Sequence, residues 1–164
     1  MKALIVYASW FGHNRAAARI AAAELARRGF SVSGAPADRV SAADIAGYDV
    51  LVLGTYTHGG RASQRLRALC ESIPLRTFDH VEVALFGTQT GQDGQHRMPG
   101  GVRELEECLA ERGVELALPP LLIRLSRAEA YLPWLEISPA ERRRIEEFAD
   151  DLWEASVPEP MIYS

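Results

Sequence analysis

The sequence predicts an α/β fold, a doubly wound five-stranded parallel sheet with helices on both faces. The first observation is that continuous apolar runs of strand length alternate five times with amphipathic segments of helical length. Strands buried on both faces of a parallel sheet read as such continuous runs. The second is that polar, glycine-rich segments follow the first, third and fourth apolar runs, where the connections to the helices are expected.

The first unit is a strand over 3–8, a polar turn over 9–15 and an Ala/Arg-rich helix from about 16 to 28. Gly29 is a plausible end of that helix, and the second strand is expected over 31–35. A brief helix is expected near 41–46.

The third strand is expected over 48–55, followed by a loop over 56–61. The next helix ends before Pro74 and buries a stripe of residues at helical spacing. The stripe consists of Leu66, Leu69, Cys70 and Ile73. The fourth strand is expected over 81–87, and a long polar loop over 88–101 follows it.

The helix after this loop is marked by Val102, Leu105 and Leu109 and closed by Gly113. The fifth strand is expected over 114–125, and its two prolines favour an edge position or a bulge. Ser138 and Glu141 predict a capping box with proline at the first position of the last helix. The apolar face of that helix consists of Ile145, Phe148, Ala149, Leu152 and Trp153. We therefore expect one domain over 1–156 and an extended tail over 157–164.

Composition, charge and cysteine spacing limit the kinds of partner and site that we expect for this chain. The chain has 164 residues, 48% of them hydrophobic and 24% charged, as in a globular domain with one core. Its formal net charge of -4 does not favour nucleic acid as a partner. No apolar run approaches the roughly 20 residues that span a bilayer, and a cytoplasmic location is expected. Cys70 and Cys108 lack metal-ligand spacing, so we expect buried, reduced thiols and no metal.

The first turn predicts a phosphate site. It runs from the carboxyl end of a strand directly into a helix, whose N-terminus presents unpaired N–H groups and a partial positive charge. In a doubly wound sheet the ligand lies at the carboxyl ends of the strands, where the strand order reverses. With the strand order 2-1-3-4-5, the loops after strands one, three and four converge at one crevice.

Three segments stand at the ends of the first, third and fourth strands: 9–14 reads Ser-Trp-Phe-Gly-His-Asn, 54–59 reads Gly-Thr-Tyr-Thr-His-Gly and 87–93 reads Gly-Thr-Gln-Thr-Gly-Gln-Asp. The first resembles the phosphate loop of the flavodoxin family, and the other two are similar to its second and third flavin loops. That family is itself a known example of this strand order, with FMN bound at the switch point. The resemblance covers the chain from its start to about residue 155. The fifth strand is most similar to that of the short-chain members.

The resemblance implies noncovalently bound FMN, held by residues of the three loops. The first loop supplies Ser9, Trp10, Phe11, Gly12, His13, Asn14 and Arg15. The second supplies Thr55, Tyr56, Thr57, His58 and Gly59, and the third supplies Gly87, Thr88, Gln89, Gly91, Gln92 and Asp93. Within the first loop, Ser9, Gly12 and the N–H groups from Gly12 to Arg15 form the expected phosphate cradle.

Several of these positions depart from the family pattern. Phe11 stands where a hydroxyl usually contacts the phosphate, and Asn14 replaces the closing threonine. Arg15, His13 or the Asn14 amide are the expected replacement donors. His58 stands where an aromatic ring commonly stacks on the flavin, for which Trp10, Tyr56 and His96 are the available substitutes.

The resemblance implies an electron carrier that passes electrons between a reductase and an acceptor protein, with no catalytic acid, base or nucleophile. A small FMN-dependent quinone or protoporphyrinogen oxidoreductase is a second interpretation, favoured by the long third loop. A third, favoured by Phe11, Asn14 and His58, is an interaction module that has lost FMN. The apolar segment 131–135 predicts a partner face or packing over the sheet edge, and the oligomeric state stays open.

Overall fold

The computed structural model describes residues 1–9, 11–90, 100–126 and 136–158. The parallel sheet has the order β2-β1-β3-β4-β5, which confirms the expected fold class. Its strands are β1 (Lys2–Tyr7), β2 (Ser31–Pro36), β3 (Val50–Tyr56), β4 (Glu82–Thr90) and β5 (Leu121–Leu125). The helices are α1 (His13–Arg27), α2 (Ala42–Ile45), α3 (Gln64–Ser72), α4 (Gly100–Glu111) and α6 (Pro139–Ser156). Two 3₁₀ turns, η1 (Ala37–Arg39) and η2 (Leu75–Asp79), complete the described elements.

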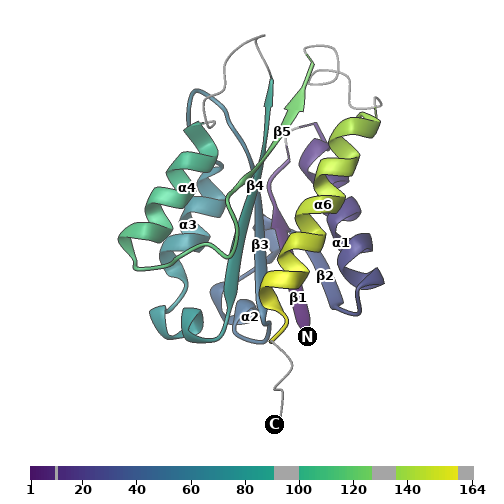
Figure 1. The fold of residues 1–164 in the computed structure, drawn as a ribbon. Helices are drawn as coiled ribbons and strands as arrows, with labels where there is room; N and C mark the ends of the chain where they lie inside the picture. The colour runs from purple at the N-terminus through teal and green to yellow at the C-terminus, as the bar shows by residue number, and fades with distance from the viewer. Residues whose placement is uncertain (10, 91–99, 127–135, 159–164) are drawn as a thin grey trace.

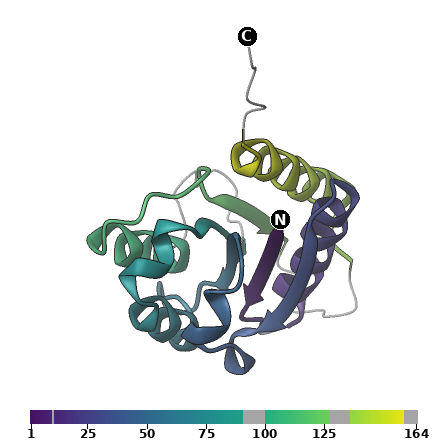
Figure 2. The same cartoon turned by 90° about the horizontal axis from the view of Figure 1, so that it is seen from below.

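Helices α1 and α6 cover one face of the sheet, and α3 and α4 cover the other (Figure 1). The view along the sheet shows the two helical layers on either side of the strands (Figure 2). All strands run in the same direction, so their carboxyl ends meet at one edge, opposite the N-terminus and the end of α6. None of the described helices is long and apolar enough to span a membrane.

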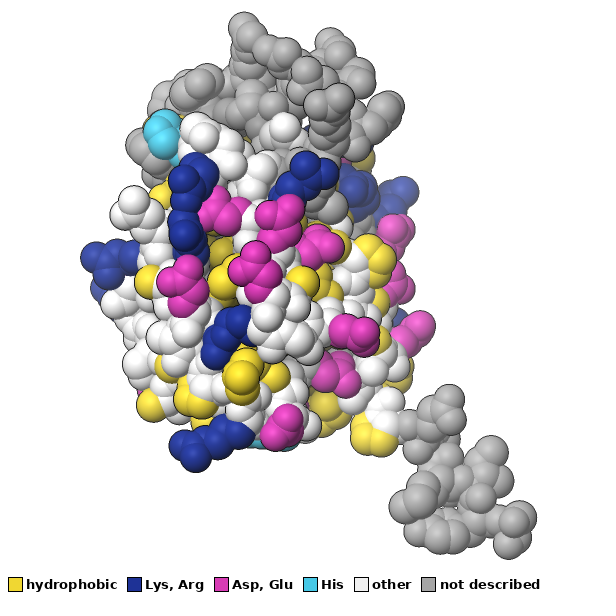
Figure 3. All heavy atoms as spheres, turned by 90° about the vertical axis from the view of Figure 1, so that its left-hand side faces the viewer, with side chains coloured by type: hydrophobic (Ala, Val, Ile, Leu, Met, Phe, Trp, Pro, Cys, Tyr) yellow, Lys and Arg dark blue, Asp and Glu magenta, His cyan; other side chains and the backbone are white. Residues whose placement is uncertain are grey.

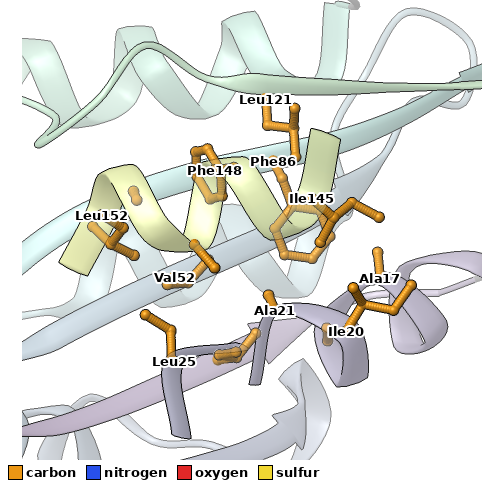
Figure 4. Packing of buried hydrophobic residues seen from close by; sticks show 14 of the residues in the cluster. Ala17, Ile20, Ala21, Leu25, Val52, Phe86, Leu121, Ile145, Phe148 and Leu152 are labelled. Carbon is orange, nitrogen blue, oxygen red and sulfur yellow. The ribbon is translucent and has the colours of Figure 1, made fainter. Parts of the chain in front are cut away.

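Successive side chains of the central strands pack alternately into two separate hydrophobic cores, one on each face of the sheet. Ile5 and Val52 point to the α1/α6 side, whereas Leu4 and Leu53 point to the α3/α4 side. Figure 4 shows the first of these cores, where residues of α1 and α6 meet the sheet around Phe86. The whole stripe predicted on α3, from Leu66 to Ile73, is buried in the second core. Because both faces are filled, the open edge is the natural place for a ligand.

The two strands at the β5 side differ from expectation. β4 continues to Thr90, past the predicted end at residue 87, because it still pairs with β5 from Phe86 to Thr90. β5 begins only at Leu121, because prolines at 119 and 120 cannot donate ladder hydrogen bonds. Before them, Leu116 forms a single bridge to Val83. The predicted edge position of the fifth strand is confirmed.

Four smaller expectations also change. α1 begins at His13, about three residues earlier than predicted, and α4 begins at Gly100 inside the predicted loop. Ser138 caps α6 by accepting from the Glu141 N–H, but the Glu141 carboxylate accepts from the Arg124 N–H and from Arg144, so the capping box is only half formed. Cys70 is buried and free as expected, whereas Cys108 is only half-buried. Burial raises the pKa of the Cys70 thiol to about 12, which keeps it protonated at neutral pH.

We expect Leu152→Ala to lower the free energy of unfolding by about 2–5 kcal/mol, because Leu152 is fully buried between α6 and the sheet and its loss leaves a cavity. Leu75→Ala removes the same atoms from a side chain that is 57% exposed, and about 0.5 kcal/mol or less should be lost. Urea unfolding followed by circular dichroism measures both. Equal losses would contradict the packing described for the α1/α6 core.

Candidate functional site

A groove of about 1030 Å³ opens at the carboxyl edge of the sheet, between the ends of β1, β2 and β3. The register brings these ends together, because Tyr7 lies beside Pro36 on one side and beside Gly54 on the other. Of the residues predicted for the site, the described lining includes Ser9, Gly12, Arg15, Tyr56 and His58. The first two predicted loops therefore meet at one groove.

The turn from β1 to α1 depends on Gly12. This residue has φ 87, in the left-handed region that side chains rarely adopt, and it precedes the first residue of α1. No side chain caps the helix. The Gly12 carbonyl accepts the first helical hydrogen bond, from the Ala16 N–H at 3.0 Å. The N–H groups in the first turn of α1 are therefore available to an anion.

Three side-chain polar atoms near this turn are buried and have no hydrogen-bond partner among the described residues. They are Ser9 Oγ, His13 Nε2 and Asn14 Oδ1. A buried polar atom without a partner costs about 1–3 kcal/mol, and native structures contain few. Three within six residues indicate that this turn is built to contact a polar ligand.

The Asn14 side chain also holds the turn in shape. It is 1% exposed, and its Nδ2 donates to the Ala8 carbonyl at 2.7 Å. The Ala8 N–H donates in turn to the Gly54 carbonyl at 2.9 Å, which ties the turn to β3. The amide predicted as a phosphate donor is thus engaged with the chain itself.

The loop after β3 is a tight hairpin turn. His58 and Arg61 form an antiparallel bridge with two backbone hydrogen bonds of 3.0 Å. Gly59 and Gly60 between them have φ 57 and φ 75, the pair of positive values of a type I′ turn. At the start of the loop, Thr55 Oγ1 donates to the Tyr56 carbonyl and accepts from the Ser63 N–H. Thr55 therefore stabilises the loop through these two hydrogen bonds. It is not among the described residues that line the groove.

The third predicted loop is described only in part. Gly87, Thr88 and Gln89 belong to β4, and Thr88 lies beside Tyr56 across the strand pair. Gly87 has a packing role, because a Cβ there would lie 2.2 Å from Val102 Cγ2. None of these three lines the groove. Trp10, His96 and the site residues Gly91, Gln92 and Asp93 lie outside the described residues, as does the segment 131–135.

Arginines dominate the charges of the groove. Its described lining contains Arg15, Arg39, Arg61, Arg65 and one carboxylate, Asp38. Glu104 pairs with Arg61 at 2.8 Å, and the other three arginines still outnumber Asp38 in the described lining. Figure 3 shows the α3/α4 face, where Lys and Arg side chains near the loop end lie beside Asp and Glu side chains, and other Lys and Arg side chains lie lower on the same face. The arginines of the groove favour an anionic ligand despite the negative net charge of the chain.

Sequence reasoning missed two groups that line the groove. One follows β2, at Pro36–Arg39, and the other begins α3, at 63–65. The end of β2 could have been found, because in the order 2-1-3 it lies next to the first turn. The start of α3 carried no signal beyond its position after the second loop.

Comparison with protein families gives one match, to the model described as flavodoxin, over residues 5–134. This match spans most of the chain. The chain belongs to the flavodoxin family. Flavodoxins bind FMN, and FMN is accordingly the cofactor of this family member. A search of curated protein sequences found no match.

Solved structures show the same fold. Oxidised flavodoxin 2 of Bacillus cereus is 25% identical, with a TM-score of 0.71 over 94% of this chain and 99% of that one. A cysteine-to-serine mutant of the flavodoxin of Pseudomonas aeruginosa is also 25% identical, with a TM-score of 0.67 over 93% and 99%. The rubredoxin oxygen:oxidoreductase of Desulfovibrio gigas is 16% identical, with a TM-score of 0.72 over 94% of this chain and 35% of that one, and this likeness shows the fold alone.

The unpaired atoms of the first turn suit FMN. Its phosphate offers acceptors to the Ser9 hydroxyl, to the His13 ring when Nε2 carries a proton, and to the N–H groups of the first turn of α1. Its ribityl chain offers hydroxyl donors, which an acceptor such as Asn14 Oδ1 requires. The described residues therefore fit the cofactor of the family.

We expect Gly12→Ala to lower the free energy of unfolding by about 1–2 kcal/mol, because alanine is strained at φ 87 although no atom lies within 4 Å of the new Cβ. Gly47→Ala is the matched control, since its Cβ meets the Asp44 carbonyl oxygen at 3.8 Å, an ordinary contact, and its φ is not positive. Urea unfolding of both variants tests the turn. A Gly12→Ala protein as stable as Gly47→Ala would contradict the conformation described.

Proposed function

We propose that this flavodoxin-family protein is an electron carrier whose FMN phosphate lies in the β1–α1 turn. The observation that carries the proposal is the set of three buried, unpaired polar atoms at an uncapped helix start. The phosphate accepts from the N–H groups of α1 and from the Ser9 hydroxyl, and Arg15 at the rim adds a charge-assisted donor. Phe11 is 38% exposed and is not among the described residues that line the groove.

Residues of the second and third loops lie beside the flavin ring of the cofactor. Tyr56 and His58 line the same groove as the first turn, and they place an aromatic ring and an imidazole beside the path of the flavin. The Gly59–Gly60 turn offers backbone groups to the ring edge. Thr57, Thr88 and Gln89 supply polar groups at the ends of β3 and β4. Trp10 and the glycine-rich stretch from Gly91 to Asp93 complete the set predicted from the sequence.

Bound FMN supplies the one-electron chemistry, and the protein binds and orients it. The carrier accepts electrons from a reductase and delivers them to an acceptor protein. Among the described residues no group of metal-ligating side chains gathers at the groove. The proposed role therefore depends on cofactor binding and on docking of redox proteins at this edge of the sheet.

We expect Arg15→Ala to raise the Kd for FMN about tenfold, the effect of one lost hydrogen bond to a charged group. The Kd for riboflavin, which lacks the phosphate, should not change. Arg19→Ala is the matched control one turn along α1, where the side chain is exposed and does not line the groove. Quenching of flavin fluorescence measures all the affinities. Equal losses for FMN and riboflavin would place the phosphate elsewhere.

The carrier role predicts that the FMN-loaded protein does not turn over NAD(P)H with a quinone by itself. Addition of a flavodoxin reductase should allow NADPH to reduce the bound flavin, and an acceptor protein should reoxidise it. Absorbance of NADPH and of the flavin follows both reactions. Steady-state quinone reduction by NAD(P)H without a reductase would instead support the oxidoreductase interpretation.

A further inference from the structure

The first turn of α4 is attached to both ends of the loop that runs from Thr57 to Ala62. The Gly101 N–H donates to Thr57 Oγ1 at 3.1 Å, at the start of the loop. At its end, the Glu104 carboxylate accepts from Arg61 Nε at 2.8 Å and from the Ala62 N–H at 3.4 Å. One helical turn thus fixes both sides of the Gly59–Gly60 turn.

The backbones of α4 and this loop also touch directly. A Cβ at Gly100 would lie 2.2 Å from the Gly60 carbonyl oxygen, and one at Gly101 would lie 2.7 Å from both Thr57 Oγ1 and the Tyr56 carbonyl oxygen. Only glycine permits such an approach. The Gly60 carbonyl is therefore packed against α4, and among the described residues no atom lies within 4 Å of the Cβ position of Gly59 or Gly60.

This arrangement leaves one peptide group able to reorient. Type I′ and type II′ turns share a positive φ at the first central residue and differ in the orientation of the central peptide. Gly59 and Gly60 are the central residues here, and the His58–Arg61 hydrogen bonds are compatible with both types. The Gly59 carbonyl can turn over while the ends of the turn stay in place.

Glu104 is suited to hold the Arg61 end of the turn. Its side chain is 19% exposed, and it also accepts from Arg67 at 3.1 Å. The hydrogen bond from Arg61 is the main reason that the Glu104 pKa lies below its usual value. A carboxylate with a lowered pKa contributes stability above its ordinary pKa near 4.5, and that contribution disappears as the pH falls through the lowered value. The interaction is therefore fully present at neutral pH.

We propose that Glu104 is a positioning residue for electron transfer: by binding Arg61 and the Ala62 N–H it fixes the Arg61 end of the His58–Arg61 turn, so that the Gly59–Gly60 peptide can reorient while this end stays in place. The proposal rests on the proposed function, because the turn matters only if it faces FMN. Glu104 lies outside the groove and acts through Arg61 and Ala62. Nothing in the sequence pattern alone singles it out among the glutamates of α4.

The test compares Glu104→Ala and Glu104→Gln with Glu107→Ala in the FMN-loaded protein. Glu107 is exposed on the same helix and makes no described hydrogen bond or ion pair, so it controls for the loss of charge. Hydrogen exchange of the Arg61 amide reports the stability of the turn, and a redox titration reports the separation of the two one-electron midpoint potentials. Glu104→Gln keeps an acceptor oxygen without the charge.

We expect exchange of the Arg61 amide to accelerate about threefold in Glu104→Ala, consistent with a partly exposed ion pair of about 0.7 kcal/mol. The two midpoint potentials should move toward each other, because a looser turn presents the Gly59 carbonyl less well after the first electron. Glu104→Gln should lie between Glu104→Ala and the wild type, and Glu107→Ala should match the wild type. Raised salt should accelerate exchange in the wild type and leave Glu104→Ala nearly unchanged.

Unchanged exchange and unchanged potentials in Glu104→Ala would overturn this proposal and leave the carrier role intact. Faster exchange with unchanged potentials would also overturn it, because Glu104 would then be structural only. If the wild-type flavin does not accept electrons in two separate one-electron steps, the proposed function itself fails, whatever the variants show. Exchange of the Arg61 amide in the FMN-free wild type and Glu104→Ala proteins would still show whether Glu104 holds the turn.

Discussion

The parallel direction of the five strands is the constraint on which the rest of this molecule depends. Both faces of the central strands β1, β3 and β4 are buried under helices, so these strands can present polar groups only at their ends. The carboxyl ends of β1, β2 and β3 meet at one edge, and there the chain turns into α1, η1 and the start of α3. The groove is a consequence of the topology, and loop residues only determine what it binds.

The first turn shows how stability is exchanged for binding. Ser9, His13 and Asn14 each bury a polar atom that no described group satisfies, and each such atom destabilises the protein when no ligand is bound. A cofactor that forms hydrogen bonds with these atoms removes this destabilisation, and the same free energy then favours its binding. The turn is nevertheless preformed. Asn14 donates a hydrogen bond across it to the Ala8 carbonyl, and Gly12 adopts a positive φ that would strain other residues. Binding energy is then not used to order the chain.

The sequence predicted the sheet, the helix order and the buried stripes, because periodicity and glycine or proline positions report burial directly. It also located the first two loops, since each follows a strand that periodicity defines. It placed the end of β4 too early and the start of β5 too early as well, because strand ends depend on the partner strand and on the prolines at 119 and 120. The half-formed capping box at Ser138 has the same origin, since Arg124 and Arg144, brought close by folding, bind the Glu141 carboxylate instead.

Contacts between distant segments account for what the sequence did not reveal about the site. Arg39 lines the groove only because β2 lies beside β1, and Glu104 reaches Arg61 across 43 residues because α4 packs beside the second loop. The two loops are consequently built on different principles. The first is held by its own residues and leaves side-chain atoms unpaired for a ligand, whereas the second is held by a neighbouring helix and pairs its turn internally. In the proposed carrier, the first loop would be the fixed anchor for the phosphate, and the second would present an adjustable peptide beside the ring.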